Sequence, residues 1–243
     1  INENDADFFL NKKVIEIVNE LHWKRDSGDP ATNRLIQLVL RNKEITTIPQ
    51  SIVDLNSLET LDLTNNQITG SIPEAIGQHN NLKILKLSNN NFGCYNYDFT
   101  AECSTLDWAP ECCIMHCNDT EECTGAVPGS IFELENIEEI NLSYNHFSNI
   151  PDNMGNLISL NSLKLNNNRI YSELPGDIIG LENLSSLNIK SNNFYGIIPQ
   201  QICSMNLNLQ SFKSWFHDNN FCCPYPDCID PGDQDTSGCA PCN

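Results

Sequence analysis

The chain has 243 residues, and 40% of them are hydrophobic, which suffices for a packed core. Its 32 acidic and 13 basic residues give a formal net charge of −19, which opposes binding to nucleic acid phosphates and to anionic membranes. Twelve cysteines, an even number, predict a disulfide framework made in an oxidising compartment, and therefore a secreted, extracellular protein.

The N-terminal residues predict a helix rather than a leader or a membrane anchor. The chain opens at Ile1 with no apolar leader, and no apolar run approaches the roughly 18 residues that span a bilayer, so we expect a processed product without membrane insertion. Residues 4–22 place Leu10, Val14 and Leu21 on one helical face, with Asn4 as the N-cap. We therefore predict a helical cap over residues 1–34 that covers the first unit of the next region.

A repeated pattern, L-x-x-L-x-L-x-x-N, occupies residues 35–202. Its starts are separated by 23, 24, 55, 23 and 24 residues, and the odd spacing equals one 24-residue unit plus 31 inserted residues. The starts are Leu35, Leu58, Leu82, Ile137, Leu160 and Leu184, with a degraded seventh near Leu207 to Leu209. A constant period with one insertion predicts a solenoid of stacked units.

Within each unit, apolar residues at positions 1, 4 and 6 alternate as they do along a half-buried strand. The asparagine at position 9 recurs because a buried amide can satisfy the backbone groups that a turn leaves unpaired. These asparagines are Asn66, Asn90, Asn145, Asn168 and Asn192. We expect them to be structural, and we expect the stacked strands to form one parallel sheet on the concave side.

Three stretches carry a resemblance to a known family: "LETLDLTNNQITGSIPEAIGQHNN", "LNSLKLNNNRIYSELPGDIIGLEN" and "LSSLNIKSNNFYGIIPQQI". They resemble plant-type leucine-rich repeats, whose units end in G-x-I-P on the convex side. The resemblance runs from about Leu35 to Ile202 outside the insertion and implies an α/β solenoid wound as a right-handed superhelix. The family includes receptor ectodomains, inhibitors of wall-degrading enzymes and structural proteins, so the fold does not select a function.

The chain departs from that family in three places. The N-terminal cap lacks the usual cysteine pair, the third repeat is interrupted, and the repeat from Ile137 has the shorter ending "HFSNIPDNMGNL".

The insertion, residues 94–123, holds six cysteines, seven carboxylates and no Lys or Arg. We predict a small disulfide-stapled module that projects from the convex side. Its cysteines are Cys94, Cys103, Cys112, Cys113, Cys117 and Cys123, and the adjacent pair is expected to bond to two different partners. Its aromatic residues, Tyr95, Tyr97, Phe99 and Trp108, are either anchors for a partner or the packing of the module itself.

Residues 203–243 are predicted to hold the degraded last repeat and a disulfide-rich C-terminal cap. The other six cysteines lie here: Cys203, Cys222, Cys223, Cys228, Cys239 and Cys242. The even number in each half suggests three bridges in each.

The outward strand positions can be assigned from the repeat register. They are Arg41, Glu59, Asp62, Lys83, Lys86, Glu138, Glu139, Asn141, Lys164 and Lys190. This nearly neutral face, with Tyr144 as its aromatic residue and Lys86 and Lys164 as central cations, is either a protein-binding surface or a solvated sheet.

Three sequons, at Asn118, Asn141 and Asn183, predict N-glycosylation and agree with secretion. A glycan on Asn141 would obstruct the centre of the concave face, and binding would then use the insertion, the edges or the ends.

No catalytic constellation is present, because the five histidines stand beside no nucleophile motif, and we expect no enzyme, no cofactor and no metal site. Two functions stay open. The first is a recognition module that binds an extracellular protein or glycan. The second is a structural subunit of a glycosylated extracellular assembly or fibril, built from copies of the chain by head-to-tail contacts.

Overall fold

The computed structural model describes residues 22–24, 34–97, 112–120, 123–207, 216–222 and 224–229. The predicted helix over residues 4–22 lies outside these ranges except for His22, which begins a strand instead of ending a helix. The helical cap and the right-handed superhelix therefore stay predictions.

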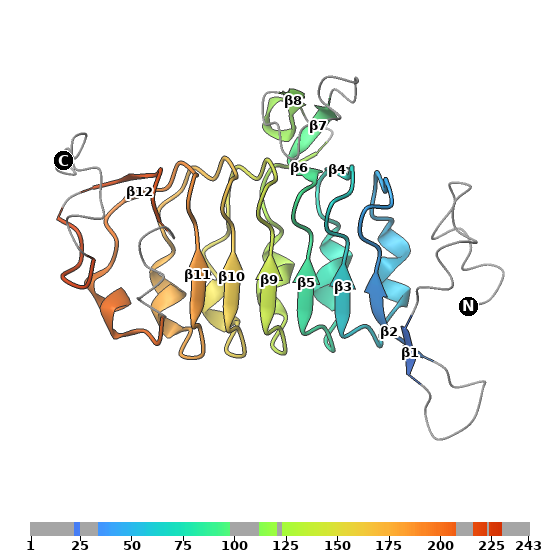
Figure 1. The fold of residues 1–243 in the computed structure, drawn as a ribbon, viewed down its shortest axis with the longest axis horizontal. Helices are drawn as coiled ribbons and strands as arrows, with labels where there is room; N and C mark the ends of the chain where they lie inside the picture. Colours follow the sequence, from blue (N-terminus) through green and yellow to red (C-terminus); the bar gives the residue numbers. More distant parts are fainter. Residues whose placement is uncertain are drawn as a thin grey trace.

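Within the described ranges, the main element is a seven-stranded sheet in the order β1-β2-β3-β5-β9-β10-β11 (Figure 1). Neighbouring strands from β2 to β11 run parallel, as predicted, whereas β1 pairs antiparallel with β2. The strands are β1 (His22–Lys24), β2 (Arg34–Val39), β3 (Thr60–Asp62), β5 (Ile84–Lys86), β9 (Glu139–Asn141), β10 (Ser162–Lys164) and β11 (Ser186–Asn188). The repeat pattern thus predicted the sheet, and only its first strand is new.

The core is a column of side chains contributed by the same positions of every repeat. Positions 1, 4 and 6 are buried in all six repeats that the sequence aligned, as Leu58, Leu61 and Leu63 illustrate at 4% exposure or less. Strand β5 pairs with β9 across the insertion in the register that the other strands use, with Leu85 opposite Ile140. The 31 additional residues are therefore accommodated outside the stack, and the period of the solenoid continues.

The recurring asparagine connects successive coils. Asn145 donates hydrogen bonds to the carbonyl oxygens of Leu87 (3.0 Å) and Leu142 (3.1 Å), and its Oδ1 accepts one from the Phe92 amide (3.1 Å). Asn66, Asn90, Asn168 and Asn192 make equivalent bonds. Each amide satisfies buried backbone groups of two neighbouring coils, which confirms the structural role predicted for these residues.

The asparagine row continues to Asn219 in the last coil. Asn219 makes the same three bonds, to the carbonyl oxygens of Ile189 and Phe216 and from the Phe194 amide. It lies 27 residues after Asn192, so the last spacing is longer than the 23 or 24 residues of the regular repeats. Leu207 is buried in the core, and the predicted start of the seventh repeat near Leu207 to Leu209 otherwise lies outside the described residues and stays a prediction.

Short 3-10 helices face away from the sheet and form the convex side (Figure 1). Five of them follow a proline, whose fixed φ suits the first turn. They are η4 (Gln50–Asp54), η5 (Glu74–Gln78), η9 (Gly129–Glu133), η10 (Met154–Asn156), η11 (Gly176–Gly180) and η12 (Gln200–Ser204). The shortened ending of the repeat from Ile137 corresponds to η10, which has three residues and follows Asn153.

Small two-stranded sheets extend the turns that follow the main strands. β4 (Thr69–Gly70) pairs in parallel with β6 (Asn91–Phe92), and β12 (Tyr195–Gly196) pairs in parallel with β13 (Asn220–Phe221).

The described part of the insertion is an antiparallel hairpin, β7 (Cys94–Tyr97) and β8 (Cys113–His116), followed by the 3-10 helix η8 (Cys117–Asp119). Figure 1 places it at the edge of the solenoid, above β4 and β6, so the predicted projection from the convex side was wrong. The insertion leaves the repeat directly after β6, before the chain reaches the convex helices, and this fixes it to the edge.

Disulfides and one glycine fix the base of this hairpin. Cys94 bonds to Cys113 and Cys117 bonds to Cys123. Gly93 has a φ of +82°, and a Cβ there would collide with the backbone carbonyl of His146. Position 93 therefore requires glycine for both its backbone conformation and its close packing.

Candidate binding surfaces on the concave face and at the solenoid edge

The concave face contains a line of position-5 side chains in register across the sheet: Asp62, Lys86, Asn141, Lys164 and Asn188. Asp62 is only 1% exposed because Arg41 covers it, donating from Nε (2.8 Å) and Nη2 (2.5 Å) to its Oδ2. Burial disfavours the charged carboxylate, but the hydrogen bonds from Arg41 and Thr64 outweigh that cost and lower the pKa of Asp62. Asp62 is therefore inaccessible to a partner, whereas Arg41 stays exposed with its charge paired.

The two predicted central cations differ in their surroundings. Lys86 pairs with Glu139 at 2.9 Å between Nζ and Oε2, whereas Lys164 forms no ion pair among the described residues. Lys83 pairs with Glu59 at 3.1 Å, and Lys190 lies 3.8 Å from Asp218. Lys164 is therefore the concave-face cation that has its charge available for a partner.

Tyr144 occupies an unusual backbone conformation for an aromatic residue. Position 8 of every coil is left-handed, with φ between 53° and 57°, and its occupants are Asn42, Asn65, Asn89, Tyr144, Asn167, Ser191 and Asp218. Asparagine and aspartate tolerate this region well, whereas a bulky side chain is strained there. Tyr144 is also 37% exposed, so the core does not explain why a tyrosine stands at this position.

The predicted glycosylation sites lie in different environments. Asn141 is partly buried at the centre of the concave face, where its Oδ1 accepts hydrogen bonds from the Ser143 amide (3.2 Å) and hydroxyl (2.7 Å). Asn183 is exposed and donates to the Ile158 carbonyl at 2.7 Å, and Asn118 belongs to η8. Occupancy of all three stays a prediction.

The aromatic residues predicted in the insertion do not act as one group. Tyr95 is 46% exposed on β7, beside the exposed Ile114 and Met115 of β8. Tyr97 instead packs edge-on against His146, with ring centroids 6.0 Å apart. Phe99 and Trp108 lie outside the described residues, so no cluster can be built from the four.

The cysteine bridges can be assigned only in part. Besides the two hairpin bridges, Cys203 bonds to Cys228, while Cys112 and Cys222 are disulfide-bonded to cysteines outside the described ranges. Adjacent Cys112 and Cys113 therefore have different partners, as expected. Four cysteines, Cys103, Cys223, Cys239 and Cys242, lie outside the described residues.

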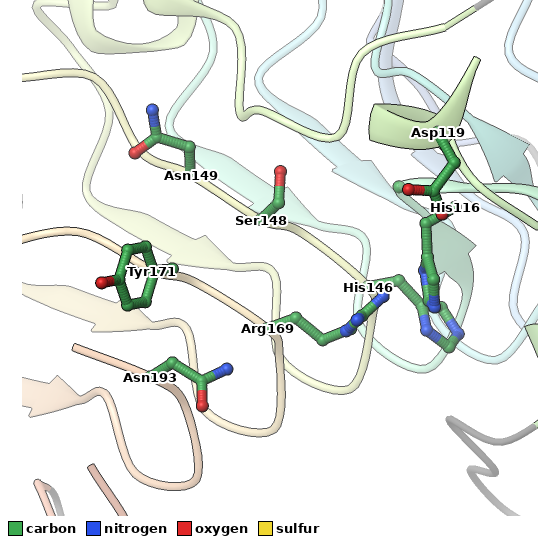
Figure 2. Close-up of a pocket in the computed structure, with 9 residues that line it drawn as sticks. His116, Asp119, His146, Ser148, Asn149, Arg169, Tyr171 and Asn193 are labelled. Carbon is green, nitrogen blue, oxygen red and sulfur yellow. The ribbon is translucent and has the colours of Figure 1, made fainter. Parts of the chain in front are cut away.

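A cavity of about 460 Å³ opens at the solenoid edge beside the inserted hairpin (Figure 2). One side of its lining comes from the base of the insertion: Gly93, His116 and Asp119. The other side comes from three successive coils: His146, Ser148, Asn149, Arg169, Tyr171 and Asn193. His146, Arg169 and Asn193 each follow the structural asparagine of their coil, so stacking places them in a row.

Two histidines in this lining are neutral at physiological pH. Burial, followed by the charges of His116 and Arg169, lowers the pKa of His146 to about 3. Burial and Arg169 also lower the pKa of His116. Arg169 is therefore the permanent cation of the cavity, and Asp119 is its carboxylate.

A cluster of metal-ligand types also lies at this edge, because Sγ of Cys113 and ring nitrogens of His116 and His146 are within 4.8 Å of one another. Cys113 is bonded to Cys94, so its sulfur is not a thiolate, and Arg169 adds positive charge beside both imidazoles. This donor set does not suit a cation.

The comparisons with known proteins support the repeat assignment. Family models described as leucine-rich repeat match residues 33–96, 136–157 and 183–205. The chain therefore contains leucine-rich repeats. No curated protein matches it in sequence. Among the described residues, no helix is long and apolar enough to cross a membrane.

Several solved structures share the fold. The ectodomain of the Arabidopsis receptor kinase HAESA, in complex with an extended IDA peptide hormone, is 25% identical over 79% of this chain and 27% of its own, with a TM-score of 0.61. A Leptospira interrogans leucine-rich-repeat protein is 31% identical over 80% of this chain and 40% of its own (TM-score 0.57). The plant peptide hormone receptor RGFR1, in complex with RGF2, is 27% identical over 80% and 30% (TM-score 0.56). The chain thus spans well under half of each of these proteins.

Proposed function

We propose that the chain is a non-enzymatic, extracellular recognition module that binds an extended segment of a partner protein on its concave face, which requires that Asn141 carry no glycan. The observation that carries the proposal is Tyr144, an exposed aromatic in a left-handed position where the other coils have Asn, Ser or Asp. Backbone strain at a single surface residue is typical of functional sites, where binding rather than stability selects the side chain.

The surroundings of Tyr144 support this role. Lys164, on the adjacent strand, has no acidic partner among the described residues and can pair with a carboxylate of the bound segment. A tyrosine supplies a rigid contact at small entropic cost, and aromatic residues dominate the energetics of protein interfaces. The peptide complexes of HAESA and RGFR1 add support from the same fold.

The test uses Tyr144→Asn, which installs the residue type of the neighbouring coils. Removing the strain should stabilise the fold by about 1 kcal/mol, measured by chemical denaturation. The same variant should lose partners that the oxidised wild-type chain captures from the extracellular fluid of its source, and Lys164→Glu should lose the same set. Ile179→Ala, which changes an exposed residue of η11 on the convex side, is the matched control. The proposal would be contradicted if the wild-type chain and both concave-face variants captured the same partner proteins in equal amounts.

A further inference from the structure

The edge cavity has a composition that the concave face does not share. Its side chains comprise one arginine, one carboxylate, two amides, a hydroxyl, two imidazoles and a tyrosine. The single positive and single negative charge balance, so the cavity does not select a strongly charged ligand. Most of these groups both donate and accept hydrogen bonds, which favours a ligand rich in hydroxyl groups.

Polar groups that line the cavity are available to a ligand. In the part of the chain that the structure describes, the guanidinium of Arg169, the amide of Asn193 and the hydroxyl of Tyr171 have no intramolecular hydrogen-bond acceptor. Figure 2 shows Arg169 pointing toward His146 and His116, while Tyr171 lies near Asn149 and Asn193 at the opposite end of the group. The donors are thus distributed along the cavity rather than concentrated at one point.

One end of the cavity is aromatic. Tyr171 is 67% exposed, and its ring lies against Tyr195, with centroids 4.8 Å apart and planes tilted by 38°. The backbone of Tyr195 is fixed, because this residue belongs to β12, which pairs with β13. A fixed, solvent-facing aromatic surface offers an apolar face to a ligand whose rim is polar.

We propose that this edge cavity is a saccharide-binding site. A sugar ring has an apolar face of C–H groups, which fits Tyr171, and a rim of hydroxyl groups, which fits Arg169, Asn149 and Asn193. The volume of about 460 Å³ lies within the range of small-ligand sites, roughly 300–1,000 Å³. The site lies on the edge beside the insertion, so it is independent of a partner bound to the concave face.

The arrangement also gives the insertion a role. Gly93, His116 and Asp119 complete the cavity only because the hairpin is fixed at its base by the Cys94–Cys113 and Cys117–Cys123 bridges. The Cys117 amide donates to the Gly93 carbonyl at 2.9 Å, which joins η8 to the lining. The repeats supply the aromatic end and Arg169, and the insertion closes the other side.

The experiment probes the full-length, oxidised chain with an array of defined neutral and uronic-acid-containing oligosaccharides, followed by titration calorimetry with each oligosaccharide that binds. Arg169→Ala removes a charged hydrogen-bond donor, and Tyr171→Ala removes the aromatic face, so each should weaken binding by about tenfold. Tyr95→Ala, at an exposed tyrosine of the same hairpin that does not line the cavity, and Tyr144→Asn should leave the affinity unchanged.

The array also distinguishes two kinds of saccharide. Binding restricted to uronic-acid members would show that Arg169 pairs with the sugar carboxylate, whereas binding of neutral members would show that it contacts hydroxyl groups. The proposal is overturned if no oligosaccharide binds, or if those that bind do so equally well to Tyr171→Ala and Arg169→Ala. Both side chains are exposed, so unchanged thermal unfolding of the two variants verifies that the fold is intact.

Discussion

The repeats and the inserted hairpin are stabilised in different ways. In the repeats, apolar positions fill a continuous core and a buried asparagine connects each coil to the preceding one. In the hairpin, Tyr95, Ile114 and Met115 are exposed, and disulfides supply the constraint. In the described part of the insertion, disulfides thus provide the constraint that apolar burial provides in the repeats.

The largest expected effect is in the repeats. Asn145→Ala leaves the buried Phe92 amide without its acceptor, at about 1–3 kcal/mol, and it removes one of the two asparagine donors to each of the Leu87 and Leu142 carbonyl oxygens, at about 1 kcal/mol each. We expect the free energy of unfolding to fall by about 3 kcal/mol or more, measured by chemical denaturation. Asn161→Ala, at an exposed asparagine of the next repeat, is the control and should change little. Similar values for both variants would mean that the asparagine row does not stabilise the stack.

A smaller, local effect is expected in the hairpin. Replacing both Cys94 and Cys113 by serine opens a bridge between residues 19 positions apart, and a loop of this size contributes about 3 kcal/mol. Because Tyr95, Ile114 and Met115 of the two strands are exposed, amide hydrogen exchange should accelerate in β7 and β8 while β9 and β10 keep their protection. Equal acceleration in all four strands would contradict the separation of the two regions.

At neutral pH the smallest effect is that of His146, which lies where the two regions meet. The folded chain lowers its pKa to about 3, whereas an unfolded histidine titrates near ~6.5, so the unfolded chain binds the proton first. The stability contributed by this group is therefore present above about pH 6.5 and is lost as the pH falls toward 3, at up to about 1.4 kcal/mol per pH unit. Denaturation curves across this interval should show a shallower pH dependence for His146→Asn. An unchanged slope would show that His146 does not cause the pH dependence of stability. The dependence would then come from groups such as His79 and His116, whose pKa values burial also lowers.

The sequence predicted the features that repeat. The period located the strands and the asparagine row, and it assigned the additional residues to an insertion without disturbing the register of β5 and β9. It did not identify Asn219 as the last member of the asparagine row, because this residue follows a longer spacing.

The edge cavity could not be predicted from the sequence. Arg169, Tyr171 and Asn193 are isolated surface residues until stacking aligns their coils and the hairpin brings Gly93 and His116 beside them. The one feature of the sequence that singles out a lining residue is that Arg169 is the only arginine after Arg41 in a strongly acidic chain.

The antiparallel strand β1 has a further consequence for association between molecules. An unpaired strand at the margin of a sheet exposes a row of N–H and C=O groups that another chain can extend, which leads to edge-to-edge aggregation. Pairing with β1 covers part of that margin of β2, so the free margin among the described residues is the three-residue strand β1, His22–Lys24. A filament of the kind predicted as the alternative function would therefore find only a short strand to extend at this end, and very short edge strands disfavour edge-to-edge pairing.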